Sequence, residues 1–293
     1  MSITEMTLTA NAKVNLYLDI TGVRADGYHL LETVMQSVDL CDVVTVSLGG
    51  DGIRVECSNP EIPSGDGNIC HKAAERFVRA LGKPLSVGIH VEKRIPHGAG
   101  MGGGSTDAAA VIASLNTMCG NPLDDEDLLR IGAEVGADVP FCLRGGTQVC
   151  RGIGDELTEI APFPERVFLV VKPDFVCDTR GGYARYDKAL IPKYGKTSEF
   201  VKSGKRFPKM MYNVFQSVYN DERIEQIIGR LTDSGAEGAI LTGSGSAVFG
   251  VFPNEQSARA AAREFPKYFT AVCRPAQKGI ITVNSVLSTL FAL

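Results

Sequence analysis

A run of glycines in the first half of the chain constrains its fold more than any other feature of the sequence. Residues 96–107 read Pro-His-Gly-Ala-Gly-Met-Gly-Gly-Gly-Ser-Thr-Asp, and the alanine-rich residues 108–115 that follow predict a helix. Glycine tolerates positive φ and lets the main chain approach another group closely, at an entropic cost. The N-terminus of a helix offers free N–H groups and the positive end of its dipole to an anion. We therefore predict that residues 96–107 form a phosphate-binding loop.

Two familiar nucleotide motifs do not fit this segment. A Walker A loop requires a lysine directly after its last glycine, and none is present. A dinucleotide fingerprint requires an acidic residue about 20 positions further on, at the end of a second strand. Asp124 and Asp125 lie at that distance, but they are predicted to open a helix. A flexible surface loop stays the alternative, although it does not explain why the glycines directly precede two hydroxyl residues and a helix.

The composition limits the number of domains and argues against nucleic acid or a membrane as the main partner. The chain has 293 residues, 44% of them hydrophobic, which allows one large domain or two ordinary ones with a substantial core. The formal net charge is -4 and no basic block stands out, so we expect no nucleic acid partner. No apolar run approaches the roughly 20 residues of a membrane span. The N-terminus lacks the basic-then-apolar pattern of a signal peptide.

The eight cysteines form no C-x-x-C pair, and most of them lie in apolar segments. This usage is typical of small core side chains in a reducing compartment, so we expect a cytoplasmic protein without a disulfide framework. No spacing suggests a protein-ligated metal site.

Apolar and polar residues alternate without interruption from Leu8 to Ile20, which predicts a strand with one buried face. Further strands are predicted at 43–48, 85–91, 167–171, 238–241 and 247–252. Helices are predicted at 69–81 with Asn68 as N-cap, at 124–136, and near residues 214 and 224. Residues 141–149 predict a hairpin that turns at Gly145-Gly146.

Strands and helices mix without regular β-α-β alternation, which predicts the α+β class and not a doubly wound sheet. A composition shift near residues 155–165 predicts a division into two domains, 1–160 and 161–293.

Several residues outside the glycine loop are candidates for chemistry. Lys13 lies on the polar face of the first strand and would by itself be an ordinary edge-strand lysine. Asp138 follows a predicted helix end and would by itself be a turn residue. Together they suggest an acid that takes a hydroxyl proton while a cation holds it ionised and aligned. Tyr28-His29 could be a plain loop or a recognition pair, and the glycine turn 243–246 could be a hairpin or a second phosphate contact.

Three segments together resemble the GHMP kinase superfamily: residues 12–16, residues 96–107 and the turn 241–246. The resemblance implies an N-terminal ribosomal-protein-S5-like ATP-binding domain, residues 1–160, and a C-terminal ferredoxin-like substrate domain, residues 161–293. Within the superfamily, residues 24–29 and 136–140 are similar to the branch that phosphorylates the 2-hydroxyl of CDP-methylerythritol for isoprenoid synthesis.

The resemblance implies roles for individual residues on the ATP side. The phosphates would be wrapped by Pro96, His97, Gly98, Ala99, Gly100, Met101, Gly102, Gly103, Gly104, Ser105 and Thr106. Asn68 and Lys93 would lie near the nucleoside. Mg²⁺ would lie near Ser105 and Thr106 but would be held chiefly by phosphate oxygens and water, as suits an ion that dehydrates reluctantly.

On the acceptor side, the resemblance makes Asp138 the base and Lys13 the cation that holds both Asp138 and the transferring phosphoryl group. Substrate contacts are implied for Asn15, Tyr28, His29, Asp138, Tyr183, Gly243 and Ser244. Tyr28 and Tyr183 would stack on the two faces of cytosine while His29 reads its edge.

The match has departures. Thr106-Asp107 stands where Ser-Ser or Ser-Asn is common, and residues 184–210 match weakly. A sister kinase acting on homoserine or a mevalonate derivative, and a non-catalytic sensor of the same fold, are the alternatives. We expect a small-molecule substrate and a monomer or weak homodimer.

Overall fold

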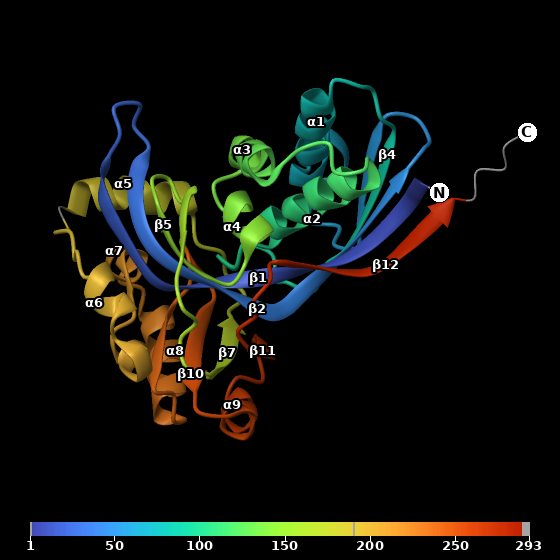
Figure 1. Cartoon of the computed structure of the whole chain (residues 1–293). Helices are drawn as coiled ribbons and strands as arrows, with labels where there is room; N and C mark the ends of the chain where they lie inside the picture. The colour runs from blue at the N-terminus through green and yellow to red at the C-terminus, as the bar shows by residue number, and fades with distance from the viewer. Residues whose placement is uncertain (1, 190, 289–293) are drawn as a thin grey trace, which may run out of the picture.

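The computed structural model describes residues 2–189 and 191–288, which form two sheets with helices packed on them (Figure 1). In the first sheet five strands lie side by side: β12 (Ile280–Ser288), β1 (Ser2–Val23), β2 (His29–Leu48), β4 (Val87–Glu92) and β3 (Ile53–Cys57). Three short strands extend it: β5 (Thr147–Arg151) and β6 (Glu156–Glu159) beyond β2, and β8 (Tyr212–Asn213) on β1.

The predicted first strand is confirmed, and it is longer than the alternation alone indicated. Its apolar residues from Leu8 to Ile20 are buried, and β1 pairs with β2 in antiparallel register along nearly its whole length. Four helices pack over the half of the sheet that lies near the N-terminus: α1 (Ile69–Leu81), α2 (Gly103–Met118), α3 (Asp125–Val135) and α4 (Val139–Arg144) (Figure 1).

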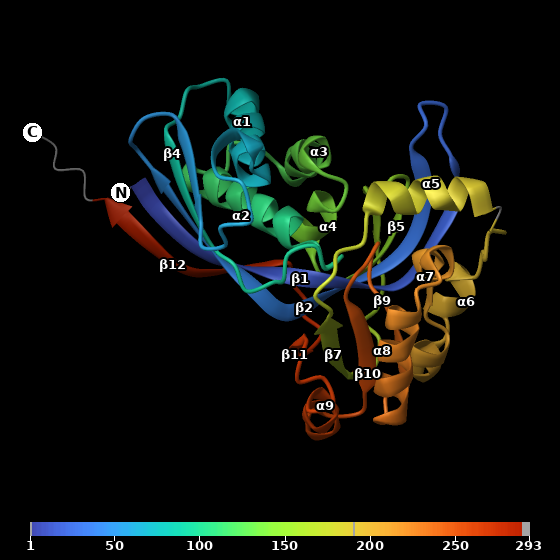
Figure 2. The ribbon, with the colours of Figure 1, turned by 180° about the vertical axis from the view of Figure 1, so that it is seen from behind.

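The second sheet is antiparallel, with strand order β11 (Phe269–Cys273), β7 (Val167–Lys172), β10 (Val248–Phe252) and β9 (Gly238–Leu241). Its helices are α5 (Thr179–Ala189), α6 (Thr197–Val201), α7 (Val214–Tyr219), α8 (Glu222–Asp233) and α9 (Glu255–Ala262). Short 3₁₀ turns lie at Gly65–Gly67 and Gly204–Lys209. Figure 2 shows this sheet beneath the long β1–β2 ribbon, on the side away from α1 and α2. The α+β class is confirmed, because antiparallel pairing predominates in both sheets.

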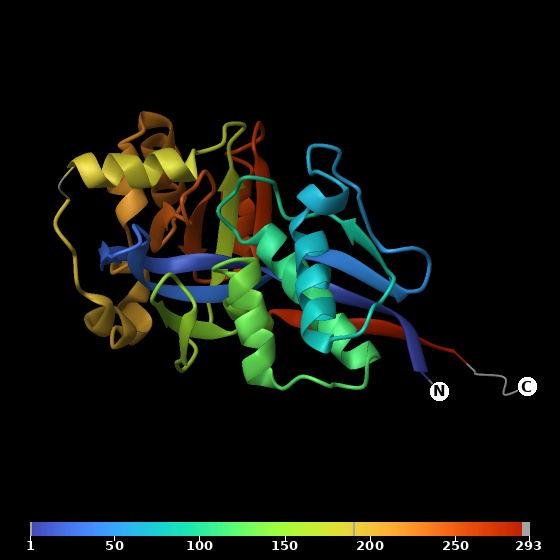
Figure 3. The same cartoon turned by 90° about the horizontal axis from the view of Figure 1, so that it is seen from above.

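The chain leaves the first sheet before β7 and pairs with it again twice, at β8 and at β12. Strand β12 runs antiparallel to β1, so residues 280–288 of the predicted second domain complete the first sheet (Figure 3). The boundary at residue 160 stays a prediction.

The predicted capping residues of two helices are confirmed. The Asn68 side chain accepts a hydrogen bond from Cys70 N at 2.8 Å, and α1 ends at Gly82 with φ +68°. The Asp124 side chain caps α3 in the same way, by accepting from Asp127 N at 2.9 Å.

The predicted hairpin at 141–149 is wrong in its first half. Residues 139–144 form the helix α4, so Asp138 precedes a helix and not a strand. Pro140 suits the first turn of a helix, and Phe141 and Cys142 are both buried. A short apolar run does not distinguish a strand from a buried helical turn, which is why the sequence pattern misled. Among the described residues, no helix is both long enough and apolar enough to cross a membrane.

Candidate active site

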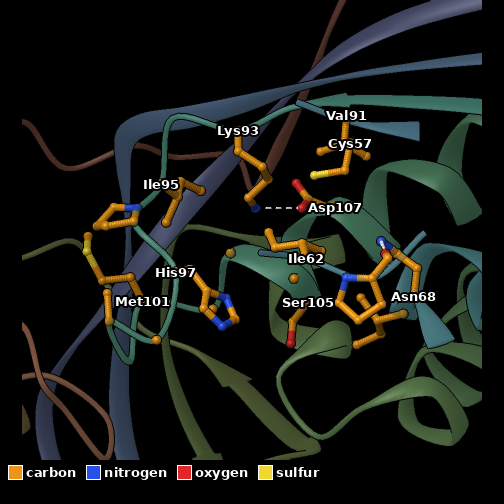
Figure 4. A pocket seen from close by; sticks show the side chains of 18 of the residues that line it. Cys57, Ile62, Asn68, Val91, Lys93, Ile95, His97, Met101, Ser105 and Asp107 are labelled. Atoms are coloured by element: carbon orange, nitrogen blue, oxygen red, sulfur yellow. Dashed lines mark hydrogen bonds and ion pairs between the residues drawn. The ribbon is translucent and has the colours of Figure 1, made fainter. Parts of the chain in front are cut away.

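The glycine loop separates two cavities. One, of about 340 Å³, lies between the loop, α1 and the end of β4, and is called here the loop cavity (Figure 4). The other, of about 300 Å³, lies between the loop, β1, β2 and α5, and is called here the strand cavity. Gly100, Gly102 and Ser105 line both. A ligand in one cavity can therefore meet a ligand in the other at these three residues.

Two glycines of the loop are required by its geometry. Gly100 and Gly102 have φ of +73° and +71°, which side chains rarely tolerate. A Cβ on Gly100 would overlap the carbonyl oxygen of Thr242, and a Cβ on Gly102 would lie 3.1 Å from Lys13 Cγ. The loop therefore touches both β1 and the C-terminal glycine turn.

That second glycine turn packs directly on the first. Ser246 N donates to Gly98 O at 3.3 Å and Ala247 N donates to Ala99 O at 3.2 Å. The turn connects the hairpin strands β9 and β10, and Gly243 and Ser244 also line the strand cavity. The structure thus brings together two glycine segments that lie far apart in the sequence.

Lys13 and Asp138 meet in the strand cavity, where Lys13 Nζ lies 3.4 Å from Asp138 Oδ2. The lysine side chain is 4% exposed and the aspartate side chain 33% exposed, so the carboxylate is the member that a ligand can reach. Lys13 Nζ also donates to Asn15 Oδ1 at 2.7 Å. A carboxylate aligned by an ammonium group can accept a hydroxyl proton at this position.

The polar face of β1 continues as a buried hydrogen-bond network. Asn15 Nδ2 donates to Thr33 Oγ1 at 2.9 Å, and Asn15 N donates to Thr242 Oγ1 at 3.0 Å. The network holds the Asn15 amide against Lys13 and links β1 to β2 and to the second glycine turn. Thr33 and Thr242 were not predicted as site residues, because neither a threonine on a strand nor one at the start of a glycine turn carries a signal of its own.

Asn68 and Lys93 both line the loop cavity. Lys93 is buried between two carboxylates: it pairs with Asp107 Oδ2 at 2.7 Å and with Asp42. Burial by itself would lower the Lys93 pKa, but the two carboxylates more than offset it and hold that pKa above its usual value. Burial raises the pKa of Asp107 well above its usual value, although Lys93 opposes the shift. Neither Asp42 nor Asp107 was predicted as a site residue. The signal that could have identified them is an acidic residue within or beside an apolar segment.

The two hydroxyl residues of the loop, Ser105 and Thr106, point to different environments. The Ser105 side chain lies at the junction of the two cavities, and the imidazole of His97 projects into the loop cavity (Figure 4). Thr106 lines neither cavity and is fully buried beside Cys142 in the first turns of α2. The structure therefore does not bring Thr106 to the predicted phosphate position, because that position of α2 faces the core.

The predicted base-binding residues are only partly assembled. The His29 ring centroid lies 4.6 Å from that of Tyr183, and His29 Nε2 lies 2.7 Å from Asp187 Oδ1. Burial, with a contribution from the Asp138 charge, raises the pKa of Tyr183 to about 12. Tyr28 is 60% exposed in the β1–β2 turn, where the Arg24 guanidinium lies 5.4 Å from its ring centroid. Within the described residues, the ring of this segment that contacts Tyr183 is that of His29, tilted by 31°, and not that of Tyr28.

No group of three or more His, Cys, Asp or Glu side chains that could hold a metal is present among the described residues. A cation at the junction of the cavities would find the Ser105 hydroxyl there, and this donor set suits Mg²⁺ that keeps phosphate and water ligands.

Comparison with protein families gives two matches in chain order. The family model described as GHMP kinases N terminal domain matches residues 68–146, and that described as GHMP kinases C terminal matches residues 199–271. The first match covers the glycine loop and Asp138, and the second covers the second glycine turn.

Several similar curated proteins share a name. A 4-diphosphocytidyl-2-C-methyl-D-erythritol kinase of Clostridium tetani is 41% identical over 91% of this chain and 98% of its own length. Proteins of the same name from Acetivibrio thermocellus and Clostridium acetobutylicum are 40% and 36% identical, over 86% and 94% of this chain and 92% and 99% of their own lengths.

Solved structures agree in fold. A crystal structure of 4-(cytidine 5'-diphospho)-2C-methyl-D-erythritol kinase has a TM-score of 0.78 at 30% identity and covers 92% of this chain and 100% of its own. Homoserine kinase from Cytophaga hutchinsonii matches with a TM-score of 0.69 at 18% identity, covering 95% of this chain and 97% of its own. At that identity the likeness shows the fold alone.

Proposed function

The chain belongs to the 4-diphosphocytidyl-2-C-methyl-D-erythritol kinase family of the GHMP kinases, and from this membership we propose how its site performs the reaction. The enzyme transfers the γ-phosphoryl group of ATP to the 2-hydroxyl of CDP-methylerythritol. The observation that carries the proposed mechanism is the pair of cavities that meet at the glycine loop, with Lys13 and Asp138 3.4 Å apart on the acceptor side.

On the donor side, we propose that ATP occupies the loop cavity. The nucleoside lies toward Asn68 and Lys93, and the phosphates follow the main chain of residues 96–106 toward Ser105. The free N–H groups and the dipole at the N-terminus of α2 (Gly103–Met118) favour negative charge there. Thr106 keeps a place in the proposed loop through its main chain, whose N–H donates to Gly102 O at 2.9 Å and so shapes the turn, since its hydroxyl is buried.

Mg²⁺ belongs to the same proposal. Ser105 is the side chain that lines both cavities, and it would lie next to an ion held otherwise by phosphate oxygens and water. When bound, the ion offsets negative charge on the phosphates.

On the acceptor side, we propose that Asp138 accepts the proton of the 2-hydroxyl group of the substrate. The oxygen of that hydroxyl group forms a bond to the γ-phosphorus. The bond between that phosphorus and the bridging oxygen breaks, and ADP leaves with the electron pair. Lys13 orients Asp138 and offsets charge on the phosphoryl group. Phosphoryl transfer depends mainly on positioning and charge, and these two side chains supply both.

The cytidine end is assigned to Asn15, His29, Tyr183 and Tyr28, with Gly243 and Ser244 beside the diphosphate. The contact between the His29 and Tyr183 rings supports a recognition site at the mouth of the strand cavity. Tyr28 completes a stack on the base only if the exposed β1–β2 turn closes over the ligand, which makes Tyr28 the least supported member of the set.

An acceptor comparison tests the function. Release of ADP should be measured with CDP-methylerythritol, homoserine and mevalonate offered in parallel to the same enzyme. We expect turnover with the first alone, and ³¹P NMR should place the new phosphate on the 2-oxygen. Faster turnover with homoserine or mevalonate would assign the chain to a sister activity, and ligand binding without turnover would make it a sensor.

We further propose a cytoplasmic enzyme that is a monomer or weak homodimer. The eight cysteines, most of them in apolar segments and without paired spacing, support a reducing compartment.

A further inference from the structure

The residues directly before the glycine loop are tied to one buried carboxylate. Asp42 lies in β2 (His29–Leu48) and is fully buried. Its Oδ1 accepts hydrogen bonds from Arg94 N at 2.5 Å and from Ile95 N at 2.8 Å. Its Oδ2 pairs with Lys93 Nζ. Both oxygens of Asp42 are therefore engaged, and all three partners lie within the three residues that lead into the loop.

The residues directly after the loop are tied to the same group through Lys93. Lys93 Nζ donates to Asp107 Oδ2 at 2.7 Å, and Asp107 lies near the start of α2 (Figure 4). The ammonium group also lies beneath the first residue of that helix, because a Cβ on Gly103 would be 3.2 Å from Nζ. The two ends of the loop are thus joined through one lysine to one strand of the sheet.

The two carboxylates of this cluster are not equivalent. Asp42 accepts three hydrogen bonds, two of them from main-chain N–H groups of the residues that lead into the loop. Asp107 keeps one oxygen, Oδ1, that is buried and has no hydrogen-bond partner within the described part of the chain. Asp42 therefore holds these residues through three contacts, whereas the Asp107 carboxylate contacts them through Lys93.

We propose that Asp42 is a positioning residue for nucleotide binding: through Lys93 and the main chain of residues 94–95, it fixes the glycine loop in the form that receives the ATP phosphates. Asp107 is the second partner of Lys93, on the other side of the loop. This inference rests on the proposed function in taking ATP as the ligand of the loop. It adds a residue that contacts neither substrate and whose effect is confined to the donor side.

The matched variants are Asp42→Asn and Asp39→Asn, which make the same chemical change on one strand. Asp39 is exposed and accepts its hydrogen bond from Arg274 N at 2.7 Å, away from the loop. For Asp42→Asn we expect the KM for ATP and the Kd for ADP to rise tenfold or more. The KM for CDP-methylerythritol should stay within about twofold, because the strand cavity is lined by other residues. For Asp39→Asn we expect both nucleotide constants within about twofold of the wild type.

A second variant, Asp42→Glu, distinguishes a loss of nucleotide binding from a folding defect in Asp42→Asn. It keeps the charge but lengthens the side chain, so it should displace residues 93–95 and weaken ADP binding while the folded protein persists by circular dichroism. A general loss of stability would instead change the constants of both substrates.

The binding of ADP, measured by calorimetry without the acceptor, separates the possible failures. Wild-type nucleotide affinity in both Asp42 variants, or an equal loss in Asp39→Asn, would overturn the inference and leave the kinase assignment intact. A wild-type protein that binds no ADP would overturn the inference together with the proposed function.

Discussion

The reactive pair is made of two side chains from segments that are distant in the chain. Lys13 comes from the middle of β1 and Asp138 from the residue before α4, and their charged atoms are 3.4 Å apart. Each residue alone fits an ordinary structural role. Their meeting beside the glycine loop is what supports a phosphoryl-transfer site, because transfer to an alcohol requires a proton acceptor and a cation at one place.

The base is tested by Asp138→Asn, which keeps the shape of the side chain but removes its ability to accept a proton. We expect kcat to fall by roughly 10²–10⁴-fold, about 3–5 kcal/mol of transition-state stabilisation. Asp125→Asn, in the exposed first turn of α3, is the matched control and should leave kcat unchanged. Near-normal turnover by Asp138→Asn would remove Asp138 from the mechanism.

The base-binding residues are tested by comparing Tyr183→Ala with Tyr28→Ala. Loss of one stacked ring should weaken acceptor binding by about 1–3 kcal/mol, seen as a higher KM for CDP-methylerythritol at unchanged KM for ATP. Tyr183 should show the larger effect, because it lines the strand cavity whereas Tyr28 is 60% exposed. If Tyr28→Ala changes the acceptor KM less than twofold, Tyr28 does not belong to the site.

At the scale of elements, the loop requires glycine at two positions because two other segments occupy the space that side chains would need there. Gly100 lies against the second glycine turn, and Gly102 lies against the stem of Lys13. The loop, the second glycine turn and β1 therefore hold one another in place. The position of the Lys13 ammonium group is fixed relative to the main chain of the glycine loop.

This packing predicts the effect of Gly100→Ala. The new Cβ would overlap the Thr242 carbonyl in addition to the cost of a positive φ, so the loop must shift. We expect at least a tenfold loss in kcat/KM for ATP and a lower Tm. Gly50→Ala is the matched control, since Gly50 has φ +81° but open space around it. That variant should lose only about 1 kcal/mol of stability and no activity, and equal kinetic losses in the two variants would contradict the packing argument.

Most elements could be predicted because their signals are local. The alternation of β1, the Asn68 cap of α1 and the acidic first turn of α3 all depend on neighbouring residues. The hairpin predicted at 141–149 failed because a short, mostly apolar run suits either a buried helical turn or a strand. Only the packing of Phe141 against the other helices decides between them.

At the scale of the whole molecule, residues 194–213, which overlap the weakly matching region 184–210, join the two sheets: β8 pairs with β1, and Asn213 Nδ2 donates to Leu241 O of β9 at 2.7 Å. Tyr212 in β8 pairs with β1, and its ring stacks on Tyr194 with 4.2 Å between centroids. The main chain of this segment is held by buried polar groups of β1, since Gly195 N donates to Asp19 Oδ2 and Lys196 N donates to the Tyr17 hydroxyl, both at 2.9 Å. The junction thus combines stacked rings with titratable groups.

The junction predicts how stability depends on pH. Burial, with a contribution from Asp19, raises the pKa of Tyr212 to about 12. A folded-state pKa above the unfolded value of about 10 stabilises the fold fully below pH 10, and this contribution is lost as pH rises through 12. Urea unfolding at pH 8, 10 and 11.5 should show that Tyr212→Phe loses less stability than the wild type, by about 1 kcal/mol allowing for partial exposure. Parallel pH curves for the two proteins would contradict the assignment.

The amino-acid sequence alone determined the glycine loop before α2, the buried face of β1, the α+β class and the family, because these depend on spacing and on the identity of neighbouring residues. Only the tertiary structure decided that Asp42 holds the loop through Lys93, that Thr106 faces the core, and that His29 rather than Tyr28 lies beside Tyr183. Such contacts join elements that are remote in sequence, and they depend on how helices and strands pack, which no local pattern records.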